Sequence, residues 1–153
     1  MASPLHEREQ TGFAIYGVIQ SLIDSQEALV EIGEKIMDRD LKRFFLAESL
    51  KRAEFRGELE SLLNREGVGR LRESRTGPGT VQRTLAGLRL KPRDVDEDKL
   101  LATVEQGEEA ACDAYHYAMH AFLPHPVREL LAVQASHIQE THEFVKAARQ
   151  RAA

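Results

Sequence analysis

The sequence has 153 residues, of which 30% are charged and 6% aromatic, and its formal net charge at pH 7 is -4. This length fits one domain with a real hydrophobic core, and the negative charge argues against a nucleic-acid partner, which needs a basic surface. A single cysteine excludes an internal disulfide framework and favours a reducing cytoplasm, where we expect the protein to be. Because no apolar run approaches the roughly 18 residues of a membrane-spanning helix, we expect no membrane partner.

The first half of the chain predicts two long helices, over about residues 10–37 and 41–66. Both segments carry apolar residues at the three- and four-residue spacing of an amphipathic helix. Their apolar stripes consist of Ile15, Ile19, Leu22, Leu29, Gly33 and Ile36, and of Leu41, Phe44, Phe45, Phe55, Leu59 and Leu62. The polar break between them is only Asp38-Arg39-Asp40, so the two helices should be antiparallel neighbours.

Residues 67–95 differ from the rest and predict a long connection. They contain five of the ten glycines and two of the five prolines. One short extra helix is expected inside this stretch, over Val81–Leu90. The stretch is long enough to run back along a bundle of about 40 Å, which would make the second and third helices parallel, as in ferritin-like bundles with a single crossover.

The last third of the chain again has helical spacing. The third helix is expected over Asp96–Phe122, with an acidic first turn that suits a helix N-terminus, and Pro124 ends it. Pro126 can open the fourth helix, which runs to about Arg149. The apolar stripes of these helices consist of Leu101, Val104, Ala111, Tyr115, Ala118 and Phe122, and of Val127, Leu130, Leu131, Ile138 and Val145.

Together these patterns predict an all-α fold. We expect a ferritin-like four-helix bundle over residues 10–150, with the crossover at about 67–95 between the second and third helices. Residues 1–9 are polar and should form a flexible N-terminal tail.

Each apolar stripe is interrupted near its middle by a polar side chain. The interruptions are Gln26, Glu48 and Glu108 on the first three helices, and Gln134 with His137 or Thr141 on the fourth. Counting back from the turns at about 1.5 Å per residue puts these groups at similar heights, so we expect one polar layer across the bundle. A carboxylate in such a layer needs a base, a hydrogen-bond donor or a metal as its partner.

Two interpretations of the polar layer remain open. In the favoured one, Glu48 and Glu108 pair with Lys51 or Arg52 in a metal-free network, and no cofactor is expected. In the alternative, the two carboxylates and His137 bind iron or manganese, since these ions prefer several carboxylate oxygens. Besides Glu48, Glu108 and His137, the predicted layer consists of Gln26, Lys51, Arg52, Tyr115, Gln134, Thr141 and His142.

An ordered set of short stretches spans roughly residues 12–150. It consists of Asp24-Ser25-Gln26-Glu27-Ala28, Asp40-Leu41, Phe45, Arg52, Phe55, Glu58-Leu59, Glu105-Gln106-Gly107-Glu108 through Tyr115, Leu123-Pro124, Val127-Arg128, Gln134, Ile138, His142 and Arg149. This set resembles a family of uncharacterised bacterial ferritin-like four-helix-bundle proteins, a domain of unknown function related to rubrerythrin and ferritin. That family typically has Asp-Gly-Glu on its first helix, where this chain has Ser25 and Gln26 after Asp24, and Lys51 replaces an acid. The resemblance therefore implies the fold, and it implies a weakened metal site.

A second group of metal-type ligands lies on the third helix. Cys112, His116 and His120 follow one another at four-residue spacing, which would suit zinc. The two histidines rotate away from the apolar stripe, however, and we interpret the row as partly exposed surface.

The favoured function is a non-enzymatic bundle protein, stress-related by family association, with a degenerate polar layer in place of a di-iron site. The alternatives are an iron- or manganese-binding protein or di-iron oxidase, and a carrier of a small apolar ligand. We also expect a homo-oligomer, with a dimer favoured, because Phe13, Ile32 and Leu46 lie off the apolar stripes and long apolar-edged helices commonly pair.

Overall fold

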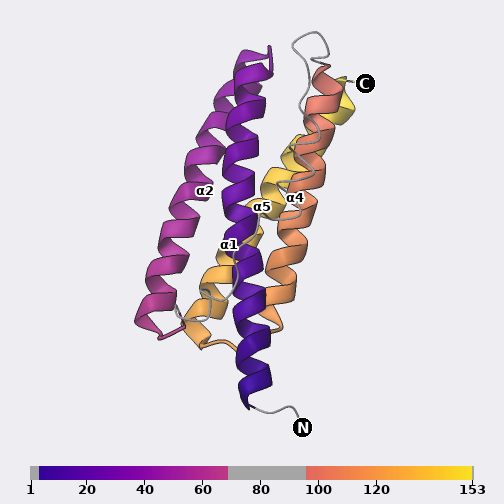
Figure 1. Ribbon diagram of the computed structural model, residues 1–153. Helices are drawn as coiled ribbons and strands as arrows, with labels where there is room; N and C mark the ends of the chain where they lie inside the picture. The colour runs from indigo at the N-terminus through magenta and orange to yellow at the C-terminus, as the bar shows by residue number, and fades with distance from the viewer. Residues whose placement is uncertain (1–3, 69–95, 153) are drawn as a thin grey trace.

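The computed structural model describes residues 4–68 and 96–152, and within these ranges it contains four α-helices and no strand. The helices are α1 (Pro4–Lys35), α2 (Arg39–Arg65), α4 (Glu97–Met119) and α5 (His125–Ala152). They form a four-helix bundle in which α1 packs against α2 and α4, and α5 packs against α4 and less extensively against α2. Figure 1 shows the end of α2 and the start of α4 at opposite ends of this bundle.

The helix boundaries follow from local chemistry that the sequence already contains. Asp38 caps α2, since its side chain accepts hydrogen bonds from the backbone N–H groups of Asp40 (2.9 Å) and Leu41 (3.0 Å). Asp96 caps α4 in the same way. Such caps satisfy N–H groups that have no partner within the helix. Gly67, after the end of α2, has a φ of 74°, the left-handed conformation that favours glycine there.

The N-terminal tail expected over residues 1–9 is partly wrong, because α1 already begins at Pro4. In Figure 1 the first turns of α1 extend beyond the rest of the bundle. Apolar periodicity detects only packed helix faces, whereas residues 7–10 are exposed. Glutamate, arginine and glutamine are nevertheless good helix formers, so a polar segment continues the helix without a core contact.

Two other apolar assignments are also corrected. Phe122 is 82% exposed, because α4 ends at Met119 and the buried Leu123 takes the core position instead. Ile32 is buried, because α1 packs on two helices and its apolar face is wider than one stripe. The predicted crossover, apart from residues 67 and 68, and its short helix over Val81–Leu90 lie outside the described residues.

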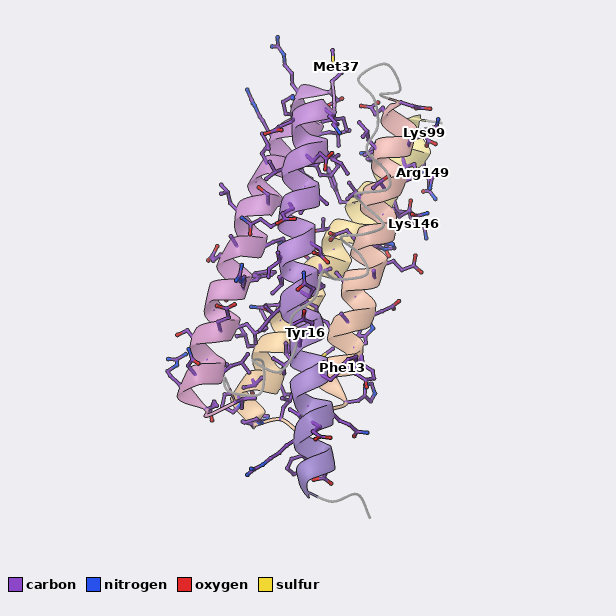
Figure 2. All side chains as sticks on the ribbon, viewed as in Figure 1. Phe13, Tyr16, Met37, Lys99, Lys146 and Arg149 are labelled. Atoms are coloured by element: carbon purple, nitrogen blue, oxygen red, sulfur yellow. The ribbon has the colours of Figure 1, made fainter. Side chains whose placement is uncertain are left out.

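Ion pairs along the seam between α4 and α5 hold these helices at the end of the bundle near the C-terminus. Arg149 donates from Nε to Asp98 and from Nη1 to Glu105, both at 3.1 Å. Figure 2 shows Arg149, Lys146 and Lys99 along this seam. Because exposed pairs of this kind are screened by solvent, the apolar core contributes more to the stability of the bundle.

Gly33 lets α1 and α2 approach closely. A Cβ atom at this position would lie 2.9 Å from Cδ2 and 3.0 Å from Cγ of Leu46. We expect Gly33→Leu to lower the free energy of unfolding by about 1–3 kcal/mol, because the extra atoms overpack the interface. Urea denaturation followed by circular dichroism would measure this.

Gly57 provides the control, since a Cβ atom there would meet nothing within 4 Å. Gly57→Ala should raise the free energy of unfolding by about 0.5–1 kcal/mol through helix propensity. Equal effects of the two substitutions would show that α1 and α2 are not in tight contact at Gly33.

Candidate functional site

The apolar core consists of two clusters separated by a layer of polar side chains. One cluster includes Leu22, Phe55, Ala111 and Ile138, and the other begins beyond the layer on each helix, at Leu29, Phe45, Val104 and Val145. Buried polar residues fill the gap between the two clusters. They are Asp24 on α1, Glu48, Ser49 and Arg52 on α2, Glu108 on α4, and Thr141 on α5. A layer of buried polar side chains therefore crosses the middle of the bundle.

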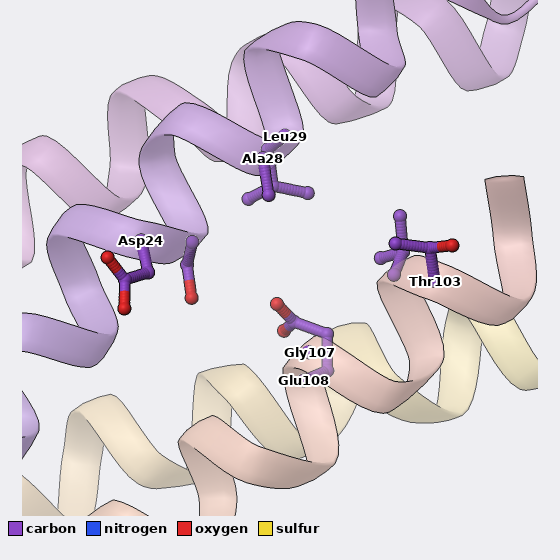
Figure 3. A pocket seen from close by; sticks show the side chains of 8 residues that line it. Asp24, Ala28, Leu29, Thr103, Gly107 and Glu108 are labelled. Atoms are coloured by element: carbon purple, nitrogen blue, oxygen red, sulfur yellow. The ribbon is translucent and has the colours of Figure 1, made fainter. Parts of the chain in front are cut away.

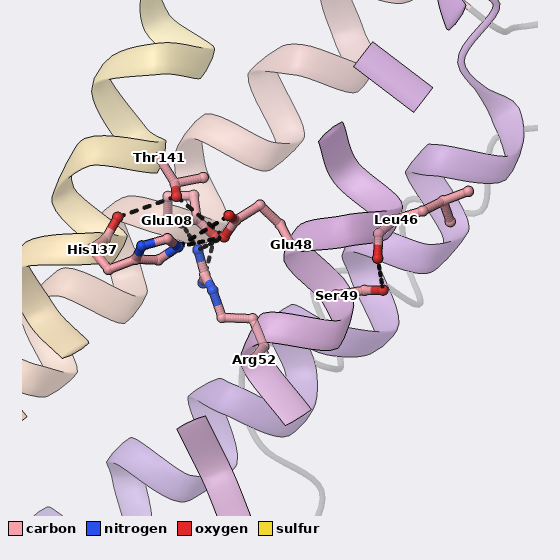
Figure 4. Close-up of polar contacts among 7 residues, drawn as sticks. All are labelled: Leu46, Glu48, Ser49, Arg52, Glu108, His137 and Thr141. Carbon is pink, nitrogen blue, oxygen red and sulfur yellow. Dashed lines mark hydrogen bonds and ion pairs between the residues drawn. The ribbon is translucent and has the colours of Figure 1, made fainter. Parts of the chain in front are cut away.

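Arg52 lies at the centre of this layer and is completely buried, with 0% of its side chain exposed. Its Nη1 donates to Oε1 of Glu108 at 2.9 Å and its Nη2 to Oε2 at 2.5 Å. Nη2 also lies 3.5 Å from Oε2 of Glu48, one turn earlier on α2. The guanidinium thus forms a two-pronged pair with one carboxylate, the strongest arrangement for such groups, and an ion pair with a second (Figure 4).

Glu48 is held by α5 as well as by Arg52. Nε2 of His137 lies 3.0 Å from both oxygens of Glu48. Oγ1 of Thr141 lies 3.3 Å from Oε2 of Glu48 and 3.2 Å from the backbone carbonyl of His137, so its single proton is shared between these two acceptors. The His137 side chain is 31% exposed, so the network runs from the seam between α2 and α5 into the core.

The charges of this network support one another against the cost of burial. Burial lowers the pKa of Arg52, but Glu108 and Glu48 raise it more, and the net shift is upward. Burial raises the pKa of Glu108, and because Arg52 offsets only part of this effect, the net shift of Glu108 is also upward. Arg52 therefore stays charged, and the network contains two carboxylates and one permanent cation. Removal of either partner would leave a buried charge without compensation.

A second hydrogen-bonded chain joins three helices beside the ion pairs. The Tyr115 hydroxyl donates to Oε1 of Gln134 at 2.7 Å, and Nε2 of Gln134 donates to the backbone carbonyl of Phe55 at 3.0 Å. Burial raises the pKa of Tyr115, against the effect of Arg52, so the hydroxyl remains a donor. All of these groups are buried and satisfied, as buried polar groups in native proteins usually are.

Tyr115→Phe tests this chain. The substitution removes the hydroxyl that donates to Gln134 and leaves the buried Oε1 of Gln134 without this partner. This should lower the free energy of unfolding by about 1–3 kcal/mol. Tyr117→Phe is the matched control, because Tyr117 lies on the same helix and is mostly exposed; its effect should stay within about 0.5 kcal/mol. Urea denaturation would measure both, and equal losses would contradict the assignment.

Gln26 does not join the layer, although the sequence placed it at the centre of the α1 stripe. It is only half-buried, and Asp24 is the buried polar residue of α1 at this level. Oδ1 of Asp24 accepts a hydrogen bond from Nε2 of Gln20 at 3.0 Å. Sequence reasoning missed Asp24 because it assumed one apolar stripe, whereas α1 packs on two helices. Asp24 was nevertheless the first residue of the matching Asp24-Ser25-Gln26 stretch.

Lys51 is also outside the layer, which corrects the prediction that it could pair with the core carboxylates. Its side chain is 42% exposed and its ammonium lies 3.6 Å from Oε2 of Glu54 and 5.7 Å from the centre of the Phe55 ring. His142 is also outside the layer. Its side chain is mostly buried and its Nδ1 lies 3.9 Å from Oε1 of Glu143. Both residues were predicted as members of the layer, but the ion pairs they form are with Glu54 and Glu143, which lie outside it.

The donor set does not fit a two-metal centre. Such a centre in a ferritin-like bundle takes a Glu from each of two helices and a Glu-x-x-His pair from each of the others. Here Arg52 lies against both Glu108 and Glu48. Among the described residues, no group of three or more His, Cys, Asp or Glu side chains is arranged to hold a metal ion. A metal bound by Glu48, Glu108 and His137 would first have to displace the guanidinium.

The row on α4 does not form a metal group either. Cys112 is buried, with Sγ 3.4 Å from Oε1 of Gln139, while His116 and His120 are exposed. Burial and then the charge of Glu108 raise the pKa of the Cys112 thiol. A protonated, buried thiol is a poor nucleophile and a poor metal ligand.

A small pocket opens between α1 and α4 at the level of the layer. It is lined by Asp24, Ser25, Ala28, Leu29, Thr103, Val104, Gly107 and Glu108. Figure 3 shows Asp24 and Glu108 on opposite sides of it. Its volume is about 20 Å³, enough for about one water molecule and too small for an apolar ligand.

Together, the helices and the buried network define an all-helical bundle with an arginine–carboxylate layer across its core. Residues 12–121 match the family described as "Domain of unknown function (DUF2383)", and the chain belongs to this family. No curated protein matches the sequence. Among the described residues, no helix is both long and apolar enough to cross a membrane.

Proposed function

We propose that the protein is a non-enzymatic ferritin-like bundle in which an ion-pair network takes the place of a di-iron site. The observation that carries this proposal is the position of Arg52. Its guanidinium is completely buried, pairs with Glu108 through two hydrogen bonds and contacts Glu48. A permanent cation thus occupies the position between the two carboxylates where a metal cation would be needed.

The proposed role is structural or interactive, and stress-related by the family resemblance. A scaffold needs a rigid core with a single arrangement of helices, and a hydrogen-bonded polar layer favours one register over others. We further propose a cytoplasmic homodimer. The homodimer was expected because three apolar side chains lie off the apolar stripes. Of these, Phe13 is exposed and can contact a second chain, whereas Ile32 is buried and Leu46 packs against Gly33 within the same chain.

Metal content tests the proposal directly. Protein purified without chelator and then incubated with ferrous iron in air should contain well below about 0.1 iron or manganese per chain, because the donors are already engaged. Elemental analysis would measure this. A content of about one or two metals per chain that is lost in Glu48→Ala or Glu108→Ala would overturn the proposal and favour an oxidase.

Glu60→Ala is the matched control for that experiment. Glu60 lies on the same helix as Glu48 and forms a surface pair with Arg56 at 2.9 Å. Metal that is lost equally from Glu60→Ala would be bound to surface carboxylates and would leave the proposal standing.

A further inference from the structure

The groups around the head of Arg52 come from α2, α4 and α5. Glu108 comes from α4, while Glu48 is fixed by His137 and Thr141 from α5. The Glu48 contacts to α5 do not involve Arg52, so this carboxylate has partners besides its ion pair with the arginine. The guanidinium group of Arg52 therefore occupies a binding site between two carboxylates, to which it is attached through its own side chain on α2.

We propose that Glu108 and Glu48 form a guanidinium-binding site, filled by Arg52, which accepts free guanidinium ion when the Arg52 side chain is removed. This inference rests on the proposed metal-free layer. A planar guanidinium presents parallel N–H pairs that match the two oxygens of a carboxylate, whereas an ammonium ion is a point charge without this geometry. The 2.9 Å and 2.5 Å contacts with Glu108 use that match.

The tether prevents Arg52 from using the site completely. Its Nη2 serves both Glu108 and Glu48, while its buried Nε has no hydrogen-bond partner among the described residues. A free guanidinium ion has three equivalent edges and can reorient, so one edge can face Glu108 while another faces Glu48.

Arg52→Ala is the test variant, and its melting temperature is the measurement. Guanidinium chloride at about 5–50 mM, far below denaturing concentrations, should raise the melting temperature of this variant by about 3 °C or more, because only the folded state has the site. The wild-type protein and Arg56→Ala, which loses a surface arginine, should show no rise. Urea, methylammonium chloride and sodium chloride at equal concentrations should not stabilise Arg52→Ala.

Each result decides the question. A rise specific to guanidinium supports the site, and an equal response to sodium chloride or urea overturns it. Stabilisation by manganese or ferrous ion that equals that by guanidinium also overturns the assigned preference. If Arg52→Ala does not fold alone, recovery of its helical circular dichroism in guanidinium replaces the melting temperature, and no recovery overturns the inference. Metal bound to the wild-type protein would instead refute the proposed function.

Discussion

Arg52→Met is expected to lower the free energy of unfolding by about 3–5 kcal/mol, which is the usual cost when one partner of a buried ion pair is removed. Methionine fills much of the same volume, so the loss reports charge more than a cavity. Glu108 would keep its buried carboxylate without the two hydrogen bonds from Arg52. Because a domain of this size has about 5–15 kcal/mol of stability in total, the variant should lie near the limit of folding.

Urea denaturation followed by circular dichroism would measure this loss as a midpoint lower by about 1.5–2.5 M, for a slope near 2 kcal/mol/M. Arg56→Met is the control, since Arg56 makes a 2.9 Å pair with Glu60 but its side chain is 41% exposed. Exposed pairs contribute little, so this control should lose less than about 1 kcal/mol. Similar losses in both variants would mean that the buried ion pairs of Arg52 contribute no more to the free energy of unfolding than an exposed pair does.

The four helices could be predicted because their packed faces repeat at helical spacing. The stripe on α5, for example, is buried at Val127, Leu131, Ile138 and Val145. The helix boundaries were predicted wrongly where a helical segment is not packed, or where the apolar spacing continues beyond the end of the helix. The start of α1 is helical but exposed, and Phe122 continues the spacing of α4 after the helix has ended.

The polar layer could be predicted in outline because a buried Glu interrupts an apolar stripe visibly. Glu48, Glu108 and Arg52 lie together in the interior of the bundle. The choice between Lys51 and Arg52 was open, since long side chains at the edge of a stripe can turn inward or reach solvent. Arg52 stands seven residues after Phe45 and seven before Leu59, which are both completely buried, and therefore shares their face of α2. Asp24 was missed because α1 contacts two helices.

The layer divides two apolar clusters that could otherwise merge. Apolar contacts tolerate sliding of one helix past another, whereas a two-pronged ion pair between α2 and α4 fits one register only. Polar groups in apolar cores fix register in some helical assemblies at a cost in stability. For this protein the idea is a hypothesis, and it predicts that stability and uniqueness of the fold can be separated.

The double variant Arg52→Met/Glu108→Met separates them. Each single substitution leaves a buried charge without its main partner, but the double substitution removes both charges together, so most of the lost stability should return. A double-mutant cycle by urea denaturation should give an interaction free energy of at least about 3 kcal/mol. Glu48 keeps its contacts with His137 and Thr141 in the double variant.

Losses that simply add in the double variant would show that Arg52 and Glu108 act independently, and the pair would then not organise the layer. If stability returns but the amide resonances broaden or double, the apolar replacement has released the register of α2 against α4. If stability returns with one sharp set of resonances, apolar packing alone fixes the register. The ion pair would then only compensate the buried charges of Arg52 and Glu108 and would not determine how α2 and α4 are aligned.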